Sequence, residues 1–596
     1  MNASDFLMQR LMDWGVHRIY GYPGDGINGI TGAFERVEQK IDFVQVRHEE
    51  MAAFMACAHA KFTGEVGVCM ATSGPGAIHL LNGLYDANMD HAPVVAIVGQ
   101  AATEALGGSY QQEVDLQQLF EDVCDYVYTV SSPMALRHVV DRAFRTAIGY
   151  RGVCAIIVPK DIQEQKYENP PHKHNTLHSS VGYRAPVVVP ESDDLREAAA
   201  ILNAGQRIAM LVGAGALNAT DEVIAVAEKL GAGVAKALLG KAAVPDDLPF
   251  VTGTIGLLGT GPSFELMENC DTLLMVGTSF PYSEFLPKEG QARGIQIDID
   301  PKNLGLRYPT ELNLVGDSAA TMRALLPLLE QRNDRAWSDR IAKSKSKWQE
   351  RELARAHVTA DPINPQLVFV SLNDRLPPNA IITGDAGTAT NWYARNIMMR
   401  RGMKGSLSGG LATMGSAVPY AIAAKFAFPD RLCVACTGDG AMQMNGNAEM
   451  LTVAKYWKSW SDPRIIFLVL NNNDLNQVTW EQRIMGGYPK FTATQDLPPF
   501  DYGRYAQDIG LLGITVKRPH ELDAAWDRAL CADRPVIFDA HVSADIAQLP
   551  PHISFEEAHK FLSALIAGDP DERGIIKEQI KSVVAGLTPS REKSKT

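Results

Sequence analysis

The sequence predicts an α/β protein of three consecutive domains with parallel sheets, followed by a C-terminal helical tail. Short apolar runs bounded by Gly or Pro alternate along the chain with amphipathic stretches of helical length. The runs are nearly continuous in Val, Ile and Leu, as expected for parallel strands covered by helices on both faces. These runs lie at 43–48, 66–72, 94–99, 155–159, 208–213, 272–277, 295–300, 432–438, 465–472 and 536–542.

Length, composition and charge exclude several classes of protein. The chain has 596 residues, with 46% hydrophobic and 21% charged residues. That is an ordinary globular mixture, long enough for about four domains of roughly 150 residues. The net charge of −13, without a dominant Lys/Arg block, argues against nucleic acid as a partner. No apolar stretch reaches the ~18–20 residues of a membrane-spanning helix, and no signal peptide precedes the first domain. We therefore expect a cytoplasmic protein.

Two segments have the composition of connections between domains. Residues 166–190 are rich in Pro, His and polar side chains without periodicity, and residues 331–365 are densely charged, which is typical of a solvated helix. They divide the chain into predicted domains at 1–165, 190–330 and 365–550, with a tail at 551–596.

The strongest motif is Gly438-Asp439-Gly440 followed, one crossover later, by an Asn-rich run. Asp439 closes one apolar run, and Asn472 closes the next, 33 residues further on. Ligands bind at the carboxyl ends of parallel strands, and carboxylate and amide oxygens suit Mg²⁺ with diphosphate. A glycine turn with an unrelated Asn-rich loop is the alternative for either motif alone.

Two further motifs end apolar runs in the first domain. Glu49 and Glu50 follow the run at 43–48 and begin a helix-like stretch, where a carboxylate can simply be a helix-terminus charge. The segment 72–76, Thr-Ser-Gly-Pro-Gly, is a second strand-to-helix turn. Neither motif alone specifies a function.

Taken together and in order, these motifs resemble a known family. The segments 21–24 (GYPG), 47–50 (RHEE), 72–87, 410–415 (GLATMG) and the GDG…NNND pair are similar to thiamine-diphosphate enzymes of the pyruvate oxidase and acetolactate synthase group. The resemblance covers nearly the whole chain and is greatest to bacterial pyruvate oxidases. It implies a pyrimidine-binding domain, a central flavin-type domain and a diphosphate-binding domain, in that order.

The resemblance implies roles for individual residues. Glu49 matches the glutamate that bonds the pyrimidine N1′ and favours the imino tautomer, and Gln112 and Glu481 complete the expected catalytic set. Met414 matches the apolar residue beneath the cofactor, and Ala412 the residue whose carbonyl accepts from its amino group. Asp439 and Asn472 would bind Mg²⁺ by side chain and Asp474 by its main-chain oxygen. The remaining expected contacts of thiamine diphosphate are Pro23, Gly24, Ser73, Gly74, His79, Asn82, Asp385, Gly387, Gly438, Gly440, Ala441, Leu475 and Asn476.

The middle block resembles the flavin domain of the same enzymes. The expected FAD contacts are Gly213, Gly215, Thr278, Asp298, Asp300 and Asp317. Glycines here could hold a nucleotide or only turn the chain, because related enzymes keep this domain with and without flavin. Both interpretations stay open at this point.

The resemblance predicts decarboxylation of pyruvate or a similar 2-oxo acid, with electrons passed to FAD. Glu481 favours this branch, since acetolactate synthases have a pocket tryptophan there, although Trp480 lies one residue away. Non-redox acyl transfer or decarboxylation is the alternative, and a paralogue without turnover is a third, which retention of Glu49, Asp439 and Asn472 opposes. Departures at Gln111 and at 475–477, and the loop 457–463, leave the substrate open.

Two further expectations concern assembly and the tail. In the family each site is built between two subunits, which implies self-association as a dimer or tetramer. Residues 575–587 have the pattern of an amphipathic helix. Its apolar face can dock on the protein's own body, or it can touch the inner face of a membrane, as the resemblance to quinone-linked pyruvate oxidases suggests.

Overall fold

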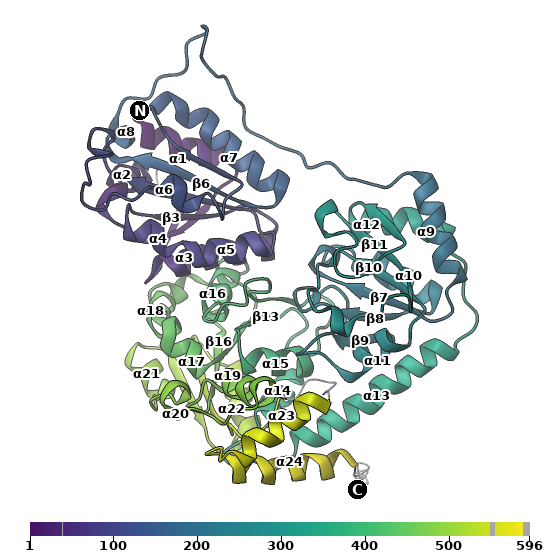
Figure 1. Cartoon of the computed structure of the whole chain (residues 1–596). Helices are drawn as coiled ribbons and strands as arrows, with labels where there is room; N and C mark the ends of the chain where they lie inside the picture. Colours follow the sequence, from purple (N-terminus) through teal and green to yellow (C-terminus); the bar gives the residue numbers. More distant parts are fainter. Residues whose placement is uncertain (38–39, 549–554, 588–596) are drawn as a thin grey trace. The chain divides into compact units, whose positions relative to one another are not determined.

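The fold consists of three six-stranded sheets, each accompanied by helices (Figure 1), which confirms the predicted class of consecutive α/β domains. The computed structural model describes residues 1–37, 40–548 and 555–587. The chain divides into two compact units. The first comprises Met1–Ala185, Ser406–Ala435 and Ala441–Ile465, and the second comprises Pro186–Gly405, Cys436–Gly440 and Ile466–Thr596.

The first sheet has the strand order β2-β1-β3-β4-β6-β5, and all five pairings are parallel. Its strands are β1 (Arg18–Gly21), β2 (Asp42–Gln45), β3 (Gly67–Ala71), β4 (Val94–Gln100), β5 (Tyr126–Thr129) and β6 (Val153–Pro159). The helices that alternate with them are α1 (Ala3–Asp13), α2 (Asn28–Arg36), α3 (Glu49–Thr63), α4 (Pro75–His79), α5 (Leu81–Met89), α6 (Leu116–Phe120), α7 (Leu136–Tyr150) and α8 (Lys160–Glu164).

Alternate residues of these strands face opposite sides of the sheet, because side chains alternate along a strand. Val95 and Ile97 of β4 join one apolar cluster with Leu7 of α1 and Val139 of α7. Helices α3 and α5 pack together, and α3 contacts β3 and β4. The central strands are therefore buried on both faces, which explains their continuous apolar runs.

The second sheet has the order β12-β11-β10-β7-β8-β9, again with parallel pairings throughout. Counted from its own first strand this is 6-5-4-1-2-3, the order of dinucleotide-binding folds. The strands are β7 (Ile208–Val212), β8 (Gly233–Lys236), β9 (Val251–Thr254), β10 (Thr272–Val276), β11 (Arg293–Asp298) and β12 (Leu312–Val315), and the helices are α9 (Ser192–Ala204), α10 (Thr220–Leu230), α11 (Gly261–Asn269), α12 (Ser318–Leu325) and α13 (Ala336–Ala356).

The two faces of this sheet belong to separate apolar clusters. Met210 of β7 packs with residues of α9, α10 and α12, whereas Leu211 packs with residues of α11 and α13. The charged segment predicted as a solvated helix forms α13, but Trp337 and Ile341 anchor that helix to the sheet. The indole Nε1 of Trp337 donates to the carbonyl of Ile208 at 3.0 Å.

The third sheet has the order β14-β13-β15-β16-β18-β17. Renumbered from its own first strand, that order is the same as in the first sheet. Its strands are β13 (Ile381–Gly384), β14 (Lys404–Ser406), β15 (Cys433–Gly438), β16 (Ile465–Asn471), β17 (Leu512–Val516) and β18 (Val536–His541). The accompanying helices are α14 (Pro365–Asn373), α15 (Thr388–Asn396), α16 (Ala417–Ala427), α17 (Asp439–Ala441), α18 (Asn447–Tyr456), α19 (Asn476–Glu481), α20 (Thr492–Gln495), α21 (Tyr502–Asp508) and α22 (Leu522–Leu530).

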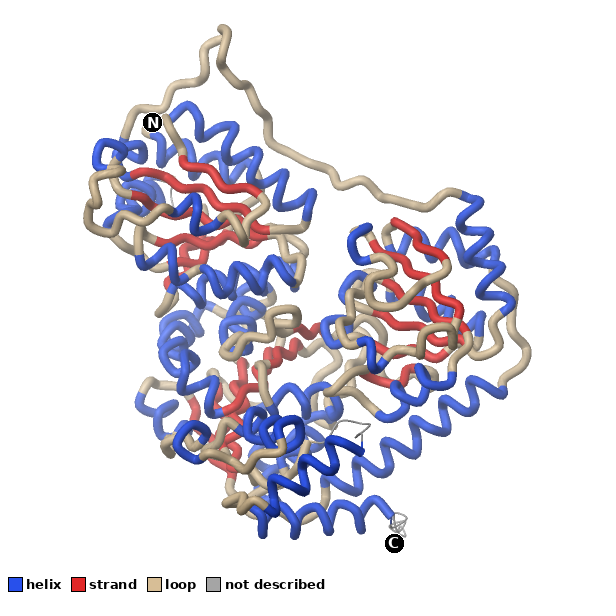
Figure 2. The backbone as a smooth tube through the Cα atoms, in the orientation of Figure 1, coloured by secondary structure: helices blue, strands red, loops and turns tan. Residues whose placement is uncertain are grey.

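Outside the sheets, the structure has a long loop and a C-terminal helical tail. Between α8 and α9, most of the segment 166–190 runs without regular structure (Figure 2), and most of its side chains are exposed. After β18 the tail forms α23 (Phe555–Ile566) and α24 (Glu572–Leu587). Within the described part of the chain, no helix has both the length and the apolar character needed to span a membrane.

The described side chains of the tail make contacts with the protein itself. Ile575 is fully buried in a cluster with Trp480, Ile484 and Leu565. Nζ of Lys581 donates to the carbonyl of Thr359 at 2.9 Å. The tail therefore docks through this part of α24, while contact with a membrane stays a prediction.

Candidate functional site

In the first and third sheets, the strand order changes direction beside the first strand of the sheet, and the predicted site residues cluster at these points. In the first sheet β1 lies between β2 and β3, and in the third sheet β13 lies between β14 and β15. The second strand of each sheet therefore lies on one side of the first strand, and the third strand lies on the other side. Ligands bind at the carboxyl ends of strands beside such a switch point. Pro23 and Ser73 follow the two strands in the first sheet, and Asp385 and Asp439 follow them in the third.

The carboxylate of Asp439 connects two strand ends of the third sheet. Its Oδ2 accepts from the main-chain N–H groups of Asn472 and Asn473, at 2.8 Å and 2.6 Å, and its Oδ1 accepts from the N–H of Gly440 at 2.9 Å. The two motifs that the sequence placed at neighbouring strand ends therefore meet in space. Asn472 curves the loop further, because its Oδ1 accepts from the N–H of Asp474 at 3.1 Å.

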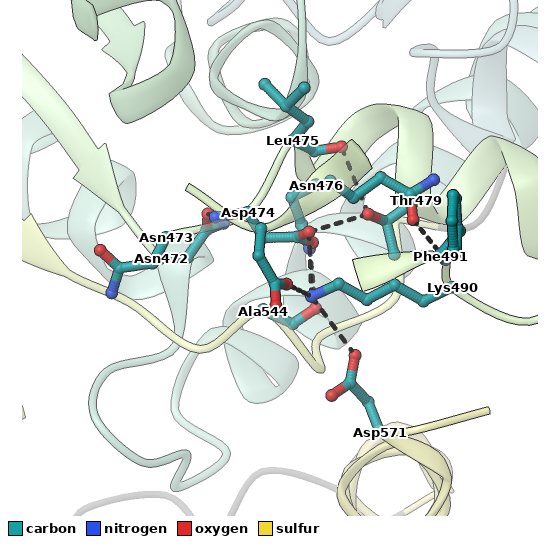
Figure 3. Close-up of polar contacts among 12 residues, drawn as sticks. Asn472, Asn473, Asp474, Leu475, Asn476, Thr479, Lys490, Phe491, Ala544 and Asp571 are labelled. Carbon is teal, nitrogen blue, oxygen red and sulfur yellow. Dashed lines mark hydrogen bonds and ion pairs between the residues drawn. The ribbon is translucent and has the colours of Figure 1, made fainter. Parts of the chain in front are cut away.

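The side chain of Asp474 is occupied by contacts within its own loop region (Figure 3). Oδ1 accepts from Oγ1 of Thr479 at 2.9 Å and lies 3.1 Å from Nζ of Lys490. Oδ2 accepts from Nδ2 of Asn476 at 2.8 Å. These contacts leave the main-chain carbonyl, rather than the carboxylate, as the oxygen that Asp474 can offer to a metal ion. Asn476 also donates to the carbonyl of Ala544 at 3.0 Å, so it braces the loop.

Space free of protein atoms lies beside two glycines at this edge. A Cβ added to Gly387 or to Gly438 would have no neighbouring atom within 4 Å, and Gly387 has a φ of 111° that only glycine adopts easily. Gly387 caps the N-terminus of α15, whose free N–H groups favour an anion. The edge offers open space, a helix N-terminus and oxygen ligands, so its residues fit a diphosphate with Mg²⁺.

Burial of Asp439 is consistent with a cation partner. Desolvation raises the pKa of Asp439 to about 7, although three backbone N–H groups lower it. Among the described residues, no cationic side chain forms an ion pair with Asp439. A buried carboxylate without a protein cation is costly, and a divalent ion would offset that cost.

Glu49 begins α3 and is buried beside the turn after β3. Its Oε2 lies 2.9 Å from Nδ1 of His79, and its Oε1 would lie 3.2 Å from a Cβ added to Gly76. The neighbouring Glu50 instead accepts from Nδ2 of Asn82 at 2.5 Å. His48 caps the helix by accepting from the N–H of Glu50 at 3.3 Å. The helix start therefore fixes two adjacent carboxylates with different partners.

The turn after β3 packs tightly against the turn after β1. A Cβ added to Gly24 would lie only 2.5 Å from Cβ of Thr72, which explains glycine there. Gln112 lies against the same turn, because Oγ of Ser73 donates to its Oε1 at 3.2 Å. Gly74 has a φ of 59°, and a Cβ there would meet Gln112 at 2.8 Å. The structure thus brings Ser73, Gly74 and Gln112 together.

The loop with the GLATMG sequence also belongs to the first unit. Ala412 is exposed and has a φ of 53°, an unfavourable value for alanine, and Met414 is half-buried. Nδ2 of Asn82 donates to Oγ1 of Thr413 at 3.1 Å. This contact places the predicted cofactor residues of the loop next to those of α3 and α5.

Comparison with known proteins decides the family. Three domains of one family match in order, described as the N-terminal TPP binding domain (residues 1–119), the central domain (195–325) and the C-terminal TPP binding domain (385–540) of thiamine pyrophosphate enzymes. The chain belongs to the thiamine pyrophosphate enzyme family. It is a thiamine-pyrophosphate-dependent enzyme with thiamine-diphosphate-binding domains at both ends.

Individual relatives carry different names. A putative thiamine pyrophosphate-containing protein of Bacillus subtilis (strain 168) is 36% identical over 560 residues, covering 94% of each chain. Pyruvate oxidase of Lactiplantibacillus plantarum is 29% identical, covering 91% of this chain and 89% of its own. The large subunit of acetolactate synthase isozyme 3 of Escherichia coli is 30% identical, covering 89% and 92%. These similarities leave the reaction within the family open.

In this thiamine pyrophosphate enzyme, the glycines expected to contact FAD lie at the switch point of the central sheet. A Cβ added to Gly213 would lie 2.4 Å from the carbonyl oxygen of Gly277, and one added to Gly215 would lie 2.7 Å from its Cα. Close packing of the two turns is enough to explain these glycines. Thr278 is buried there, and its Oγ1 accepts from the N–H of Phe280 at 3.2 Å.

The three aspartates expected to contact FAD each hold a turn. Asp298 accepts from the N–H of Asp300 at 2.9 Å, Asp300 from Lys302 at 3.0 Å, and Asp317 from Ala320 at 2.8 Å. The strand order fits a dinucleotide, but the described contacts of these carboxylates are local. Their contact with FAD stays a prediction.

Trp480 and Glu481 occupy opposite environments at the end of α19. Trp480 is 2% exposed, and its Nε1 donates to the carbonyl of Ala544 at 3.2 Å within the cluster that holds the tail. Glu481 is exposed and accepts from Nε2 of Gln477 at 2.9 Å. Of the two residues, only Glu481 has a side chain that a substrate could reach.

Sequence reasoning missed two charged residues beside the site. Lys490 lies 3.1 Å from Asp474 and 2.7 Å from Asp496, and so supports the loop that is predicted to bind the metal ion. Glu449 of α18 accepts from the N–H of Arg47 at 3.1 Å, two residues before Glu49. Their partners are remote in sequence, and an isolated Lys or Glu in a polar segment gives no signal. For Glu449, the one available signal was its position on the buried face of the helix that the sequence pattern predicts.

The charge of Glu449 should make the stability of this protein depend on pH. Burial raises its pKa to about 7 from 4.5, although hydrogen bonds from Thr452 and Arg47 lower it. The folded chain thus holds a proton that the unfolded chain releases, so stability falls as pH rises through this window. We expect Glu449→Gln to be more stable, relative to wild type, at pH 8 than at pH 5, by about 1–3 kcal/mol.

Thermal or urea unfolding at the two pH values measures this difference. Glu121→Gln, at an exposed position, is the matched control and should show no such pH dependence. A difference between Glu449→Gln and wild type that stays constant from pH 5 to pH 8 would contradict the buried-charge explanation.

Proposed function

We propose that this thiamine pyrophosphate enzyme decarboxylates pyruvate or a similar 2-oxo acid, using thiamine diphosphate and Mg²⁺, and passes the electrons to FAD. The observation that carries the proposal is the meeting of Asp439 with the Asn472 loop at an open strand edge. A hard oxygen site beside free space is what a metal-bound diphosphate requires. The pyruvate oxidase relative supports the substrate class.

The diphosphate half of the proposed site is built from the second unit. Asp439 and Asn472 would bind Mg²⁺ through side-chain oxygens, and Asp474 through its main-chain carbonyl. Asp385, Gly387, Gly438 and Gly440 would line the diphosphate, where glycine allows a close approach of the backbone. Leu475 and Asn476 would border the same space, with Asn476 supporting Asp474.

The pyrimidine half is built from the first unit. Bound thiamine diphosphate supplies a nucleophilic carbon for the ketone of the substrate. Glu49 would hold a proton at the pyrimidine N1′, and its burial beside His79 orients the carboxylate for that bond. Ala412 would accept from the amino group, and Met414 would pack beneath the rings. Gln112 and Glu481 would face the substrate. Pro23, Gly24, Ser73, Gly74 and Asn82 would surround the pyrimidine.

The proposal includes self-association, because the resemblance to the family implies that each site is built between two subunits. A dimer, or a tetramer of two dimers, would complete each site with a second copy. FAD would lie at the switch point of the central sheet, near Gly213, Gly215 and Thr278. The strand order of this sheet is that of dinucleotide-binding folds.

Non-redox chemistry is the second candidate. The acetolactate synthase relative has the same identity, within one percent, as the pyruvate oxidase relative. In that case the enzyme would transfer the acyl group to a second carbonyl, or release it after protonation, and any flavin would be structural. Burial of Trp480 favours the oxidase, since that tryptophan is not available to line a pocket.

Glu49→Gln tests the proposed proton-holding role. The variant should keep its fold and bind thiamine diphosphate, but its turnover should fall by ~10²–10⁴, the range of general acid–base roles. Carbon dioxide release from pyruvate, together with calorimetric cofactor binding, measures both. Glu65→Gln makes the same change in charge just after α3 and should be nearly neutral. Turnover of Glu49→Gln close to that of wild type would remove Glu49 from the mechanism.

Asp439→Ala tests the metal site. Loss of the carboxylate should weaken retention of thiamine diphosphate, because the metal ion links the diphosphate to the protein. We expect activity to need a large excess of Mg²⁺ and cofactor, or to be lost, whereas exposed Asp533→Ala should behave as wild type. If calorimetry finds unchanged cofactor affinity for Asp439→Ala, the residue is no metal ligand.

The absorption spectrum separates the two candidate reactions. An oxidase should show flavin bands that bleach on anaerobic addition of pyruvate, and Glu481→Gln should change the ratio of acetate to acetaldehyde. A colourless protein that still releases carbon dioxide would establish non-redox chemistry instead. An unchanged product ratio and rate in Glu481→Gln would place this side chain outside the reaction.

A further inference from the structure

The loop that carries Ala412 and Met414 has a conformation that needs support. Ala412 has a φ of 53°, and Gly415 has a φ of 94°. A non-glycine residue in this region costs about 1–3 kcal/mol and persists only where its surroundings fix the backbone. The contacts that fix this loop therefore decide whether Ala412 keeps its carbonyl in place.

Asp90, at the C-terminus of α5, holds the loop before Ala412. Its Oδ2 accepts from the N–H of Gly409 at 2.8 Å, and its Oδ1 accepts from the N–H of Gly410 at 2.6 Å. The Asp90 side chain is 1% exposed. Two charge-assisted bonds from consecutive main-chain groups fix the direction of the loop as well as its position.

Lys61 of α3 ties this carboxylate to the same loop at a second point. Its Nζ donates to Oδ2 of Asp90 at 2.6 Å, to the carbonyl of Leu407 at 3.0 Å and to the hydroxyl of Tyr420 at 2.6 Å. Tyr420 in turn donates to Oδ2 of Asp86 at 2.5 Å. These three bonds use all three donors of the ammonium group, so Lys61 has one defined position.

Contacts on the other side of Ala412 complete the support. The N–H of Thr413 donates to Oγ of Ser408 at 3.1 Å, and Oγ1 of Thr413 accepts from Asn82 at 3.1 Å. The loop is thus held both before and after its strained residue. Asn82 and Asp90 both belong to the α5 region, and Lys61 belongs to the helix that begins with Glu49.

We propose that Lys61 and Asp90 are positioning residues that fix the loop carrying Ala412 and Met414, so that the carbonyl of Ala412 keeps its place. Glu49 and Lys61 share one rigid helix and lie about 18 Å apart along it, at ~1.5 Å per residue. A change at Lys61 therefore leaves Glu49 untouched but releases the loop. The inference rests on the proposed function, in which this loop contacts the pyrimidine ring.

An ordinary buried ion pair would explain the contacts without any role in positioning. Removing one partner of such a pair destabilises a protein wherever the pair lies. The Asp141 carboxylate provides the matched control, because it is also buried in the first unit and accepts from Arg10 at 2.9 Å and from Trp14 at 2.8 Å. Asp141→Asn disturbs a similar network in the same unit, and the contacts described for Asp141 do not reach the loop.

The first measurement is amide hydrogen exchange in the full chain without cofactor. In Asp90→Asn and Lys61→Met, peptides covering 407–416 should exchange faster than in wild type, with Gly409 and Gly410 most affected. Asp141→Asn should leave these peptides unchanged. Equal exchange of the loop in wild type and in both variants would overturn the inference.

The second measurement is exchange of the thiamine C2 proton at saturating thiamine diphosphate and Mg²⁺. We expect a decrease of about 10–100-fold in both variants, since misplacement of about 1 Å can cost that much. Asp141→Asn should exchange at the wild-type rate even if its melting temperature falls equally. A fall that merely follows the melting temperature in all three variants would leave only a structural role.

A further variant guards against misfolding, and one outcome separates the inference from the proposed function. If a single substitution fails to fold, Lys61→Met with Asp90→Asn removes both charges together and should still release the loop. If the single variant Glu49→Gln exchanges the thiamine C2 proton at the wild-type rate, the proposed function fails. Faster exchange of the 407–416 amides would then still establish the anchoring, so the two failures are distinguishable.

Discussion

The arrangement of the loops at the edge of the third sheet depends on the hydrogen bonds of the Asp439 carboxylate. It accepts hydrogen bonds from three main-chain N–H groups, that of Gly440 on its own turn and those of Asn472 and Asn473 on the next turn. Without an acceptor there, those N–H groups would be left without a partner at a strand edge, at a cost of about 1–3 kcal/mol each. The same oxygens that organise the loops are the ones that an ion would need.

A second level of support surrounds both groups of proposed site residues. Lys490 forms an ion pair with the Asp474 side chain, which leaves the main-chain carbonyl of Asp474 available to a ligand. Next to Lys490, Arg483 donates to the carboxylate of Asp569 at 2.7–2.8 Å. In the first unit, Lys61 and Asp90 hold the loop around Ala412. Both arrangements use a buried cation to fix a loop whose useful atoms belong to its backbone.

The sequence predicted what depends on local pattern and strand ends. Asp439 and Asn472 could be paired because each closes an apolar run, and carboxyl ends of parallel strands meet at one edge. The crossover between them contains a π-helical turn at Met442–Gly446 before α18. Lys61 could not be recognised, because its acceptor at Leu407 is 346 residues away and the residues next to it in α3 are mostly apolar. The buried Glu449 was missed for the same reason.

The shared strand order of the first and third sheets gives two copies of one scaffold with different terminal chemistry. Asp439 directly follows β15, and the equivalent residue after β3 is Thr72; Asn472 directly follows β16, and the equivalent residue after β4 is Ala101. In the first sheet a hydroxyl and a methyl group therefore stand where the third has an acid and an amide. Two such scaffolds can hold different parts of one ligand, one an ionic group and the other a neutral heterocycle, because the residues just beyond their strand ends differ.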